Sequence, residues 1–538
     1  MRIVAIHAGH DSNACVYDEG KLEKYILTER FTGKKHDSNI YSLLPEFLSS
    51  QPEVDYFLVS GEKEIIDLIL EHYRYQVHGP WSPPDYDKGA DIVLVNGHHQ
   101  HHADLAYWNS GFDKCIAVVV DSQGHYVNRD ANDLVESESI YVYDGVKRPS
   151  RVYKSVIRDV LEKDVSGRKF EKILTQYSHK NNLGLGAFYD VAAKYIGGTT
   201  DDCGKAMALA AYGEPTPKYK FFLKGNTFNN EGAFDHYDGD RAKEITNANH
   251  KKYADFCYET QRQTEKALGD LVQSAVVSTG IKKVCVSGGY AMNVVANYYL
   301  TQRFPDVDFY FEPMCGDSGL SIAYAMNHYF LENVDFADCP CGGVPEPLGT
   351  TFLHGEVYKN DYVGEKKNLK DIAKLLYSDK SVAVYRGLAE AGQRALGNRS
   401  ILFNPLNRKA KEIVNKIKKR EWYRPFAAVV LEEDAHLFFD NVIPNEYMTM
   451  CFPVNKGLGL MIPGVTHVDK TCRVQTVSSG YLYELLKEFK KLSGYGILLN
   501  TSLNLAGDPL VETPEQAVSL LKNSSLDHLW FADTGQML

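Results

Sequence analysis

The chain has 538 residues, of which 44% are hydrophobic and 24% are charged. This composition excludes a disordered, collagen-like or coiled-coil protein, and at roughly 150 residues per domain the length predicts two or three domains. Lys and Arg total 59 against 70 Asp and Glu, a net charge of −11. Net charge therefore excludes a broad basic nucleic-acid surface and leaves open only a local basic patch.

Predicted strands open the chain. The segments MRIVAIHA, ACVYD and KYILTE form three of them, with turn residues GHDSN after the first. Residues 91–95 and 115–121 predict two more strands. A helix is expected at 183–196 and a long amphipathic helix at 261–280, and VCVSGGYAMN then predicts a strand, a glycine turn and a helix start. Strands that alternate with helices predict the α/β class.

A linker is predicted at 336–350, FADCPCGGVPEPLGT, which is rich in Gly, Pro and Cys. It divides the chain into domains at 1–345 and 346–538. After it, the helix DIAKLLYS and the strand VAVYRG resume the α/β pattern.

The ten cysteines are scattered, and several lie in apolar runs, so we expect reduced thiols instead of a disulfide framework. The pair Cys339 and Cys341 has no second pair nearby at zinc-site spacing. The start of the chain shows no signal-peptide pattern, and no apolar run reaches about 18 residues. We expect a cytoplasmic protein without a membrane segment.

Four histidines follow the strand DIVLVNG directly, at positions 98, 99, 101 and 102. His98 and His102 are four residues apart, so they share one face if a helix begins here. Two imidazoles on one helical face form half of a metal site. The alternative is a solvated histidine-rich loop.

Two aspartates are further candidates. Asp121 ends the apolar strand AVVV, and the carboxyl end of a buried strand is where ligands bind in α/β sheets, although Asp is also a common turn residue. Asp317 lies in the turn CGDSG before an apolar helix, a position that by itself favours a helix cap.

Three short glycine turns resemble one another: His7-Ala-Gly-His-Asp-Ser, Asp121-Ser-Gln-Gly and Ser287-Gly-Gly-Tyr-Ala-Met-Asn. Such turns let backbone N–H groups approach phosphates. Their order and spacing resemble the phosphate and adenosine turns of the ASKHA superfamily, the two-lobed fold of actin and sugar kinases.

The second domain carries EAGQRALGNRS, IKKREWYRPF, TCRVQTV and NTSLNLAGDPLV. Arg and Lys interleaved with glycine and small polar residues fit the binding of polyphosphate or carbamoyl phosphate. The alternative is a set of surface ion pairs.

Twelve strings, in order, resemble the O-carbamoyltransferase family that acts on nodulation factors, aminoglycosides such as tobramycin, and cephem antibiotics. The resemblance covers nearly the whole chain. It implies an ASKHA-like domain at 1–345 and a YrdC-like α/β domain at 346–538. The strings are GHDSNA, TERFTGKKH, HHQHHA, VVVDSQG, LGLGAFY, GKAMALAAYG, SGGYAMN, GDSG, RALGNRS, KKREWYRPF, RVQTV and NTSLN.

The resemblance implies a two-step reaction. The C-terminal domain would make carbamoyl-adenylate from Mg-ATP and carbamoyl phosphate and release pyrophosphate. The N-terminal domain would transfer the carbamoyl group to an acceptor hydroxyl, with His10 as general base. The family's metal ligands fall on His98, His102, Asp121 and Asp317, a mixed N/O set for which we favour Fe(II), with Mn or Zn as alternatives.

The remaining site residues are carried over by motif. Nucleotide or adenylate binding falls on Gly124, Lys205, Gly288, Gly289 and Asn293, and acceptor or carbamoyl binding on Lys34 and Lys35. Binding of carbamoyl phosphate and ATP in the C-terminal domain falls on Arg394, Arg399, Lys418, Arg424, Arg473, Asn500, Ser502 and Asn504.

Two departures from the family pattern stand out. Ala208 occupies a position where the family usually has glycine, and this narrows the backbone approach there. Ala506 stands where the family commonly has arginine, so either another residue supplies that charge or nucleotide binding there is weaker.

The acceptor is the open question. A sugar or natural-product hydroxyl is the family default. The alternative is the hydroxymethyl group of a modified pyrimidine such as 5-hydroxymethylcytosine in phage DNA, in which case the protein would act in the host cytoplasm; the Tyr- and Asn-rich composition favours this only slightly. An alternative of another class is an ATP-binding assembly module without transfer activity, against which His10 and the four-residue ligand set argue. The sequence predicts no oligomeric state.

Overall fold

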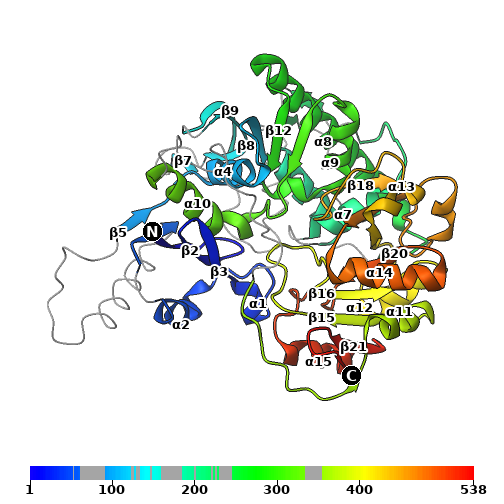
Figure 1. Ribbon diagram of the computed structural model, residues 1–538. Helices are drawn as coiled ribbons and strands as arrows, with labels where there is room; N and C mark the ends of the chain where they lie inside the picture. The colour runs from blue at the N-terminus through cyan, green and yellow to red at the C-terminus, as the bar shows by residue number, and fades with distance from the viewer. Residues whose placement is uncertain are drawn as a thin grey trace, which may run out of the picture.

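The computed structural model describes most of the chain (Figure 1). The described residues are 1–51, 54–60, 91–122, 126–128, 134–145, 148–158, 184–198, 202–219, 222–224, 227–229, 245–333 and 354–538. The predicted linker at 336–350, with Cys339 and Cys341, and the predicted nucleotide-binding Gly124 lie outside them. The domain boundary at 345/346 also falls there, so it stays a prediction.

The first lobe is a five-stranded sheet of order β3-β2-β1-β4-β5. Its strands β1, β2 and β3 form an antiparallel meander, and β1 pairs in parallel with β4, which pairs in parallel with β5. The strands are β1 (Arg2–His7), β2 (Asn13–Asp18), β3 (Lys21–Leu27), β4 (Tyr56–Ser60) and β5 (Asp91–Leu94).

The second lobe repeats this plan. Strand β6 pairs antiparallel with β8, which pairs antiparallel with β9, and β6 pairs in parallel with β12, which pairs in parallel with β13. Short β7 also pairs with β8. Two sheets of the same strand order are the two lobes expected for an ASKHA-like fold. The strands are β6 (Lys114–Val120), β7 (Tyr126–Asn128), β8 (Leu134–Asp144), β9 (Ser150–Arg158), β12 (Lys283–Ser287) and β13 (Asp308–Phe311).

Helices α4 (His98–Ser110) and α10 (Leu320–Asn333) lie between the two sheets (Figure 1). Helix α10 contacts β1 and β2, and α4 contacts β6, β8 and β12. Strand alternation explains this core: Ala117 and Val119 of β6 face α4, while Val118 and Val120 face the opposite layer, which contains α8. Because both helices are buried, residues at their ends are held rigidly.

The other elements of this part of the chain are short helices and hairpins around the two lobes, apart from the long α8. They are α1 (Thr28–Thr32), η1 (Ile40–Ser42), α2 (Leu44–Ser49), α6 (Leu185–Tyr195), α7 (Cys203–Ala210), β10 (Phe222–Lys224), β11 (Thr227–Asn229), α8 (His250–Thr279), η4 (Gly289–Met292), α9 (Val294–Arg303) and η5 (Asp317–Gly319).

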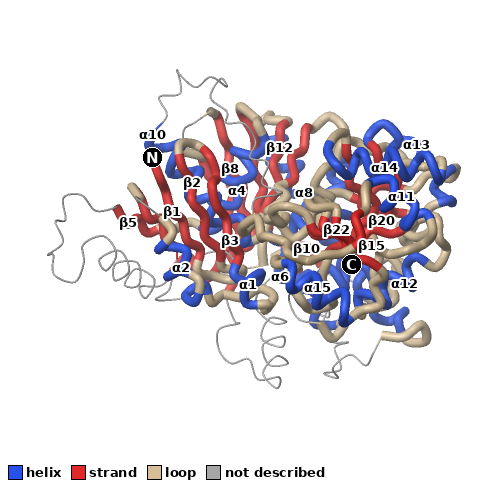
Figure 2. Tube along the Cα trace, turned by 60° about the horizontal axis from the view of Figure 1, so that its bottom comes forward, coloured by secondary structure: helices blue, strands red, loops and turns tan. Residues whose placement is uncertain are grey.

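The C-terminal domain is built on a nine-stranded mixed sheet of order β14-β22-β21-β15-β16-β20-β17-β19-β18. Figure 2 shows its strands β15, β20 and β22 among the helices at the right of the view. Side chains alternate between its faces: Val382 and Val384 pack under α11 and α14, and Ala383 and Tyr385 under α12 and α15. The strands are β14 (Glu365–Lys366), β15 (Val382–Tyr385), β16 (Arg399–Phe403), β17 (Ala427–Leu431), β18 (Cys451–Pro453), β19 (Thr471–Val477), β20 (Ile497–Ser502), β21 (His528–Phe531) and β22 (Gln536–Met537).

Helices cover both faces of this sheet, so the predicted α/β class is confirmed for both parts of the chain. They are α11 (Leu369–Tyr377), α12 (Ala410–Lys418), η8 (Glu432–Asp434), α13 (Ala435–Phe438), η9 (Leu458–Met461), α14 (Gly480–Ser493) and α15 (Pro514–Asn523).

Buried contacts of His354 join the two domains. The backbone at His354 forms bridges to Tyr25 of β3 and to Ala389 of the C-terminal domain. Its imidazole Nε2 accepts from the Leu27 amide at 2.8 Å, and its Nδ1 lies 2.7 Å from Glu512 Oε2. Both His354 and Glu512 side chains are fully buried, so this contact ties the first lobe to the C-terminal domain.

Several predicted elements needed correction. The predicted strand KYILTE ends at Leu27, and Thr28 starts α1. The amphipathic helix expected from residue 261 begins already at His250. The eight cysteines in the described part are all free, in agreement with the prediction for them. No helix among the described residues is both long and apolar enough to cross a bilayer.

Candidate functional site

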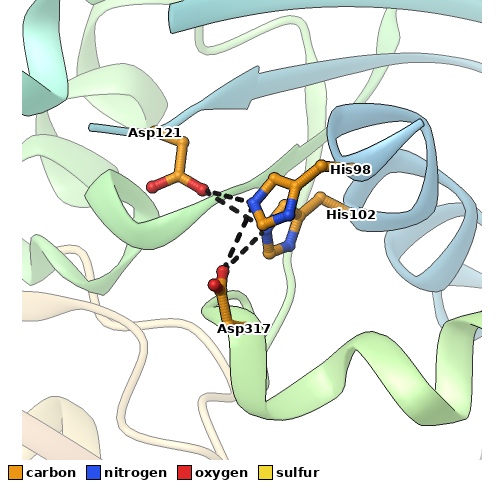
Figure 3. A group of neighbouring side chains, drawn as sticks. All are labelled: His98, His102, Asp121 and Asp317. Carbon is orange, nitrogen blue, oxygen red and sulfur yellow. Dashed lines mark hydrogen bonds and ion pairs between the residues drawn. The ribbon is translucent and has the colours of Figure 1, made fainter. Parts of the chain in front are cut away.

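Helix α4 starts at His98, directly after Gly97. Gly97 has φ 98° and ψ 59°, a left-handed conformation that favours glycine and turns the chain from β5 into the helix. His98 and His102 therefore lie one turn apart, as the spacing predicts. Their Nε2 atoms are 3.1 Å apart (Figure 3).

Two aspartates complete this cluster from other segments. Asp121 follows the end of β6, and Asp317 begins η5 just before α10. Asp121 Oδ2 lies 3.2 Å from His98 Nε2 and 3.3 Å from His102 Nε2. Asp317 Oδ1 lies 3.4 Å and 3.3 Å from the same two nitrogens (Figure 3). We call these four residues the four-donor site.

The four-donor site fits a divalent metal ion. One ligand atom from each residue lies within 4.8 Å of the others. Ligand atoms about 2.1 Å from one ion are about 3.0 Å apart in octahedral geometry and about 3.4 Å apart in tetrahedral geometry, which brackets the nitrogen–oxygen separations found here. Two imidazoles and two carboxylates suit first-row metals such as iron, manganese or zinc.

The charges at this site are compatible with a divalent cation. Burial raises the pKa of Asp317, but His98 and His102 outweigh it and hold that pKa well below its usual range. Burial alone would lower the pKa of His98, but Asp317 and Asp121 raise it to about 10. Two buried carboxylates thus stay ionised and require positive charge, which a divalent ion supplies when it displaces the imidazole protons.

His7, at the end of β1, is a site residue to which the sequence analysis gave no role. Burial lowers its pKa to about 4, so its imidazole is neutral near pH 7. Its Nδ1 is 3.0 Å from both Ser60 Oγ and Tyr324 Oη, and its Nε2 is 3.2 Å from the His10 carbonyl oxygen and 3.9 Å from Asp317 Oδ2. His7 therefore joins the first glycine turn to the four-donor site. The sequence feature that could have identified His7 is the first glycine turn, which starts at this residue.

His10 lies in that turn with its imidazole 55% exposed, and its Nδ1 is 3.3 Å from Asp11 Oδ2. The predicted acceptor-binding Lys34 and Lys35 follow α1 on the exposed side of the same lobe. Lys35 is close enough to Lys418 of the C-terminal domain to help lower its pKa, although burial is the main cause.

The glycine turn after β12 abuts the four-donor site. Gly288 has φ 86°, and a Cβ atom there would lie 2.3 Å from the Val120 carbonyl oxygen, so this close approach needs glycine. A Cβ on Gly289 would lie 3.1 Å from Asp121 Oδ1. Asn293 caps α9 by accepting from the Ala296 amide at 3.1 Å.

Basic side chains gather in the C-terminal domain. Burial and the charges of Arg394 and Arg424 lower the pKa of Arg473, and burial and Arg424 lower the pKa of Arg394. Burial, Arg420 and Arg424 lower the pKa of Lys418. Buried cations that repel one another are suited to bind an anion. We call Arg394, Lys418, Arg424 and Arg473 the basic cluster. Arg420 lies beside this cluster and was not predicted as a site residue, although it belongs to the motif KKREWYRPF.

Lys418 joins the last predicted motif to this cluster. Its Nζ donates to the Ser502 carbonyl oxygen, to Ser502 Oγ at 3.1 Å and to Asn504 Oδ1 at 2.8 Å. The basic Nζ of Lys418 thus lies against the segment that contains Ala506, where the resemblance leads us to expect an arginine.

Arg399, which the resemblance placed among the phosphate-binding residues, makes structural contacts. Its guanidinium donates to backbone carbonyl oxygens, including those of Arg386 at 2.7 Å and Gly387 at 3.0 Å, and its side chain is fully buried. Asn500 is also buried, and it donates to Gln475 Oε1 at 2.9 Å.

The basic cluster meets the N-terminal part directly. Arg394 Nη2 donates to the Met292 carbonyl oxygen at 3.0 Å, in the turn after β12. Gln393 Nε2 lies 3.9 Å from Cys315 Sγ, two residues before Asp317. On α7, Lys205 Nζ lies 3.0 Å from Glu421 Oε1, and Glu421 Oε2 lies 3.7 Å from Arg424 Nη1. His467 Nε2 also approaches the carbonyl oxygen of Ala208 at 3.0 Å.

Family models cover most of this arrangement. A model described as "Carbamoyltransferase N-terminus" matches residues 86–326, which include the four-donor site, and one described as "Carbamoyltransferase C-terminus" matches 373–535, which include the basic cluster. The chain belongs to the carbamoyltransferase family. It is therefore a transferase enzyme, which argues against the alternative of an assembly module without transfer activity.

Two of the relatives match over nearly the whole chain, and a third matches about half of it. Nodulation protein NolNO of Sinorhizobium fredii is 28% identical over 97% of this carbamoyltransferase and 78% of its own length. Uncharacterized protein sll1178 of Synechocystis is 27% identical over 97% of this chain and 94% of its own. Nodulation protein U of Bradyrhizobium diazoefficiens is 30% identical over 47% of this chain and 43% of its own.

Among solved structures, full-length HypF in its phosphate- and nucleotide-bound form aligns with a TM-score of 0.40 and 16% identity, over 62% of this chain and 47% of that one. A ROK family protein from Streptococcus pneumoniae in complex with sucrose aligns with a TM-score of 0.31 and 11% identity, over 62% of this chain and 99% of that one. The two-lobed fold of the carbamoyltransferase itself is defined by the repeated strand order of its sheets.

Proposed function

We propose that this carbamoyltransferase is ATP-dependent and works through carbamoyl-adenylate. In the C-terminal domain, carbamoyl phosphate, ATP and one water would give carbamoyl-adenylate, pyrophosphate and phosphate. In the N-terminal domain, an acceptor hydroxyl oxygen would bond to the carbamoyl carbon while AMP leaves. The observation that carries the proposal is the contact between the basic cluster and the turns that flank the four-donor site, through Arg394 and Gln393.

The basic cluster suits the first step. ATP and carbamoyl phosphate together bring several phosphate charges into the site, and charged hydrogen bonds to them are worth about 1.5–3 kcal/mol each. The positive charges of Arg424 and Arg473 repel one another. Bound phosphates relieve that repulsion, so the cluster favours anions over a neutral ligand.

The four-donor site suits the second step. His98, His102, Asp121 and Asp317 would hold a divalent ion, which as a Lewis acid supplies positive charge for the carbamoyl or phosphate oxygens when bound. The neutral His7 lines this site, with its Nε2 3.9 Å from Asp317 Oδ2.

His10 would take the proton from the acceptor hydroxyl. Its imidazole is more than half exposed, its backbone carbonyl oxygen lies 3.2 Å from His7 Nε2, and an imidazole titrates near the working pH. An exposed base beside a buried site favours an acceptor that approaches from solvent. We propose a sugar or natural-product hydroxyl as that acceptor.

Pyrophosphate release tests the first step without knowledge of the acceptor. Purified enzyme, Mg-ATP and carbamoyl phosphate should release pyrophosphate, and omission of carbamoyl phosphate should abolish this. Release that needs no carbamoyl phosphate would contradict adenylate formation.

An acceptor panel tests the second step. Radiolabelled carbamoyl phosphate is supplied with aminoglycosides, a cephem with a free hydroxymethyl group, chitin oligosaccharides, and DNA containing 5-hydroxymethylcytosine. Label on a sugar or antibiotic supports the proposed acceptor class. Label confined to the DNA would replace it with the pyrimidine hydroxymethyl group.

A further inference from the structure

The Asp11 carboxylate lies between two imidazoles. Asp11 Oδ2 is 3.3 Å from His10 Nδ1, and Asp11 Oδ1 is 2.7 Å from His36 Nδ1. The two imidazole rings stack, with centroids 4.9 Å apart and planes inclined by 18°. One carboxylate thus faces an imidazole nitrogen with each of its oxygens.

The surrounding backbone holds this carboxylate in place. Asp11 and His36 both adopt left-handed conformations, with φ of 54° and 57°, which non-glycine residues rarely do. The Ser12 amide donates to the Asp37 carbonyl oxygen at 3.1 Å, which ties the turn to the loop after α1. The His36 amide donates to Glu29 Oε2 at 2.9 Å, which ties that loop to α1. Strained backbone held by such bonds is typical of functional sites.

The carboxylate is ionised at working pH. Burial raises the pKa of Asp11, but hydrogen bonds from His10 and His36 outweigh burial and lower it to about 2. An ionised carboxylate only accepts hydrogen bonds, so the proton of each neutral imidazole is drawn to Nδ1. On His10, Nε2 is then the basic nitrogen.

We propose that Asp11 is a positioning residue for carbamoyl transfer: it fixes the Nδ1–H tautomer of His10 and increases its basicity, and His36 anchors the Asp11 carboxylate for this task. The inference rests on the proposed role of His10 as general base. The same logic applies in hydrolase triads, where a carboxylate orients the histidine base.

Other ionisable groups near His10 set the background for its titration. They are His36, stacked on its ring; Glu29, bonded to the His36 amide; and His7 with Asp317, reached through the His10 carbonyl oxygen. The Asp11 carboxylate lies directly against the His10 ring, so its removal should lower the pKa of His10.

Chemical modification measures this basicity without an acceptor. Diethylpyrocarbonate reacts with unprotonated imidazole, so the pH midpoint of His10 modification, followed by peptide mass spectrometry, reports its pKa. In the full-length protein, Asp11→Asn should lower that midpoint by about 0.5–1 pH unit. Asparagine tolerates the left-handed conformation, so this variant should fold. The exposed His436, distant in sequence and on α13, serves as the internal control. An unchanged midpoint at His10 would overturn the proposal.

Two variants of His36 test the anchor. His36→Asn keeps an N–H donor near the position of Nδ1, so the pH midpoint of His10 modification should stay close to that of wild type. His36→Ala removes this donor, so the midpoint for His10 should fall part of the way toward that of Asp11→Asn. Equal midpoints in these two variants would remove His36 from the proposal.

The role of His10 itself is tested separately. With an acceptor identified by the panel, the Asp11→Asn effect on transfer should disappear in a His10→Asn background, since Asp11 acts through His10. Normal transfer by His10→Asn would refute His10 as the base and leave the modification result standing. An Asp11→Asn effect that persists without His10 would refute the positioning role and leave the base assignment intact.

Discussion

At the residue scale, the four-donor site takes two side chains from one helix, one from the end of a strand and one from a short 3-10 helix. His98 and His102 come from the first turn of α4, Asp121 from the end of β6 and Asp317 from η5. Because the nitrogens and oxygens already lie 3.1–3.4 Å apart, little rearrangement is needed to bind an ion. Loss of one ligand should therefore affect metal binding more than folding.

The metal prediction follows from this geometry. His102→Ala removes one donor and leaves ionised carboxylates, so we expect metal content to fall by at least tenfold and carbamoyl transfer to be nearly lost. Elemental analysis of the purified protein measures the first effect. His101→Ala is the matched control, since His101 Nδ1 lies 3.3 Å from Asp104 instead. If the wild-type protein bound no metal ion under any metal-loading condition, the four-donor site would not be a metal site.

His10 carries a second prediction at this scale. His10→Asn retains size and hydrogen bonding but not basicity, so metal and adenylate formation should persist while transfer falls about 10²–10⁴-fold. The comparison is made by pyrophosphate release and by label transfer on the same preparation. Near-normal label transfer would show that another group or water accepts the proton.

Some of these site residues could be predicted from the sequence and others could not, for physical reasons. The His98–His102 pair could be predicted because helical spacing is local. Asp317 resembled a helix cap, and only the family resemblance placed it with the histidines, since 215 positions separate it from His102 in the chain. His7 was missed because its contacts to Tyr324 and Asp317 depend on how α10 packs on β1.

At the element scale, strand ends and glycine turns place the site. Strands β6 and β12 are parallel neighbours, so Asp121 and the turn after Ser287 emerge at the same edge. The alternation of strands and helices was readable from the sequence. The start of α8 at His250 could not be read from the sequence. The helical turns before residue 261 are stabilised by tertiary contacts, which a local sequence pattern does not show.

Gly288 gives a prediction for these elements. Gly288→Ala should place a Cβ 2.3 Å from the Val120 carbonyl oxygen at φ 86°, so the turn must shift and displace Asp121. We expect a loss of stability of about 2–4 kcal/mol and weaker metal binding. Gly280→Ala is the control: its φ is 72°, but nothing lies within 4 Å of the new Cβ, so it should cost about 1 kcal/mol and spare the metal. Equal effects in thermal unfolding and metal analysis would contradict the close-approach argument.

At the scale of the whole molecule, the two domains share buried contacts beyond the sites. The contact between His354 and Glu512 joins β3 to the C-terminal domain, and Arg394 reaches the turn after β12. The sequence predicted two domains but not how they dock, because docking depends on surfaces that only form after each domain has folded. The position of the boundary stays a prediction.

The buried Glu512 predicts a pH dependence of stability. Burial raises the pKa of Glu512, but His354, Arg30 and Arg399 outweigh it and lower that pKa. A lowered folded-state pKa means that the ionised carboxylate stabilises the fold above the unfolded value of about 4.5, and that this contribution is lost as the pH falls through the folded value.

Glu512→Gln should therefore lower the free energy of unfolding at pH 7 by about 2–4 kcal/mol and flatten its fall below pH 4.5. Denaturant unfolding at several pH values measures both effects. Glu515→Gln, at an exposed position on α15, is the control and should change neither. A Glu512→Gln profile parallel to wild type would contradict the assignment.

The central claim is that two sites in one chain divide the reaction. Its most direct test is acceptor-free, carbamoyl-phosphate-dependent pyrophosphate release, measured side by side in Arg424→Ala and His102→Ala. The account predicts at least a tenfold slower release in Arg424→Ala, because a charged phosphate contact is lost, and near wild-type release in His102→Ala. Equal loss in both variants would contradict separate sites for adenylate formation and carbamoyl transfer.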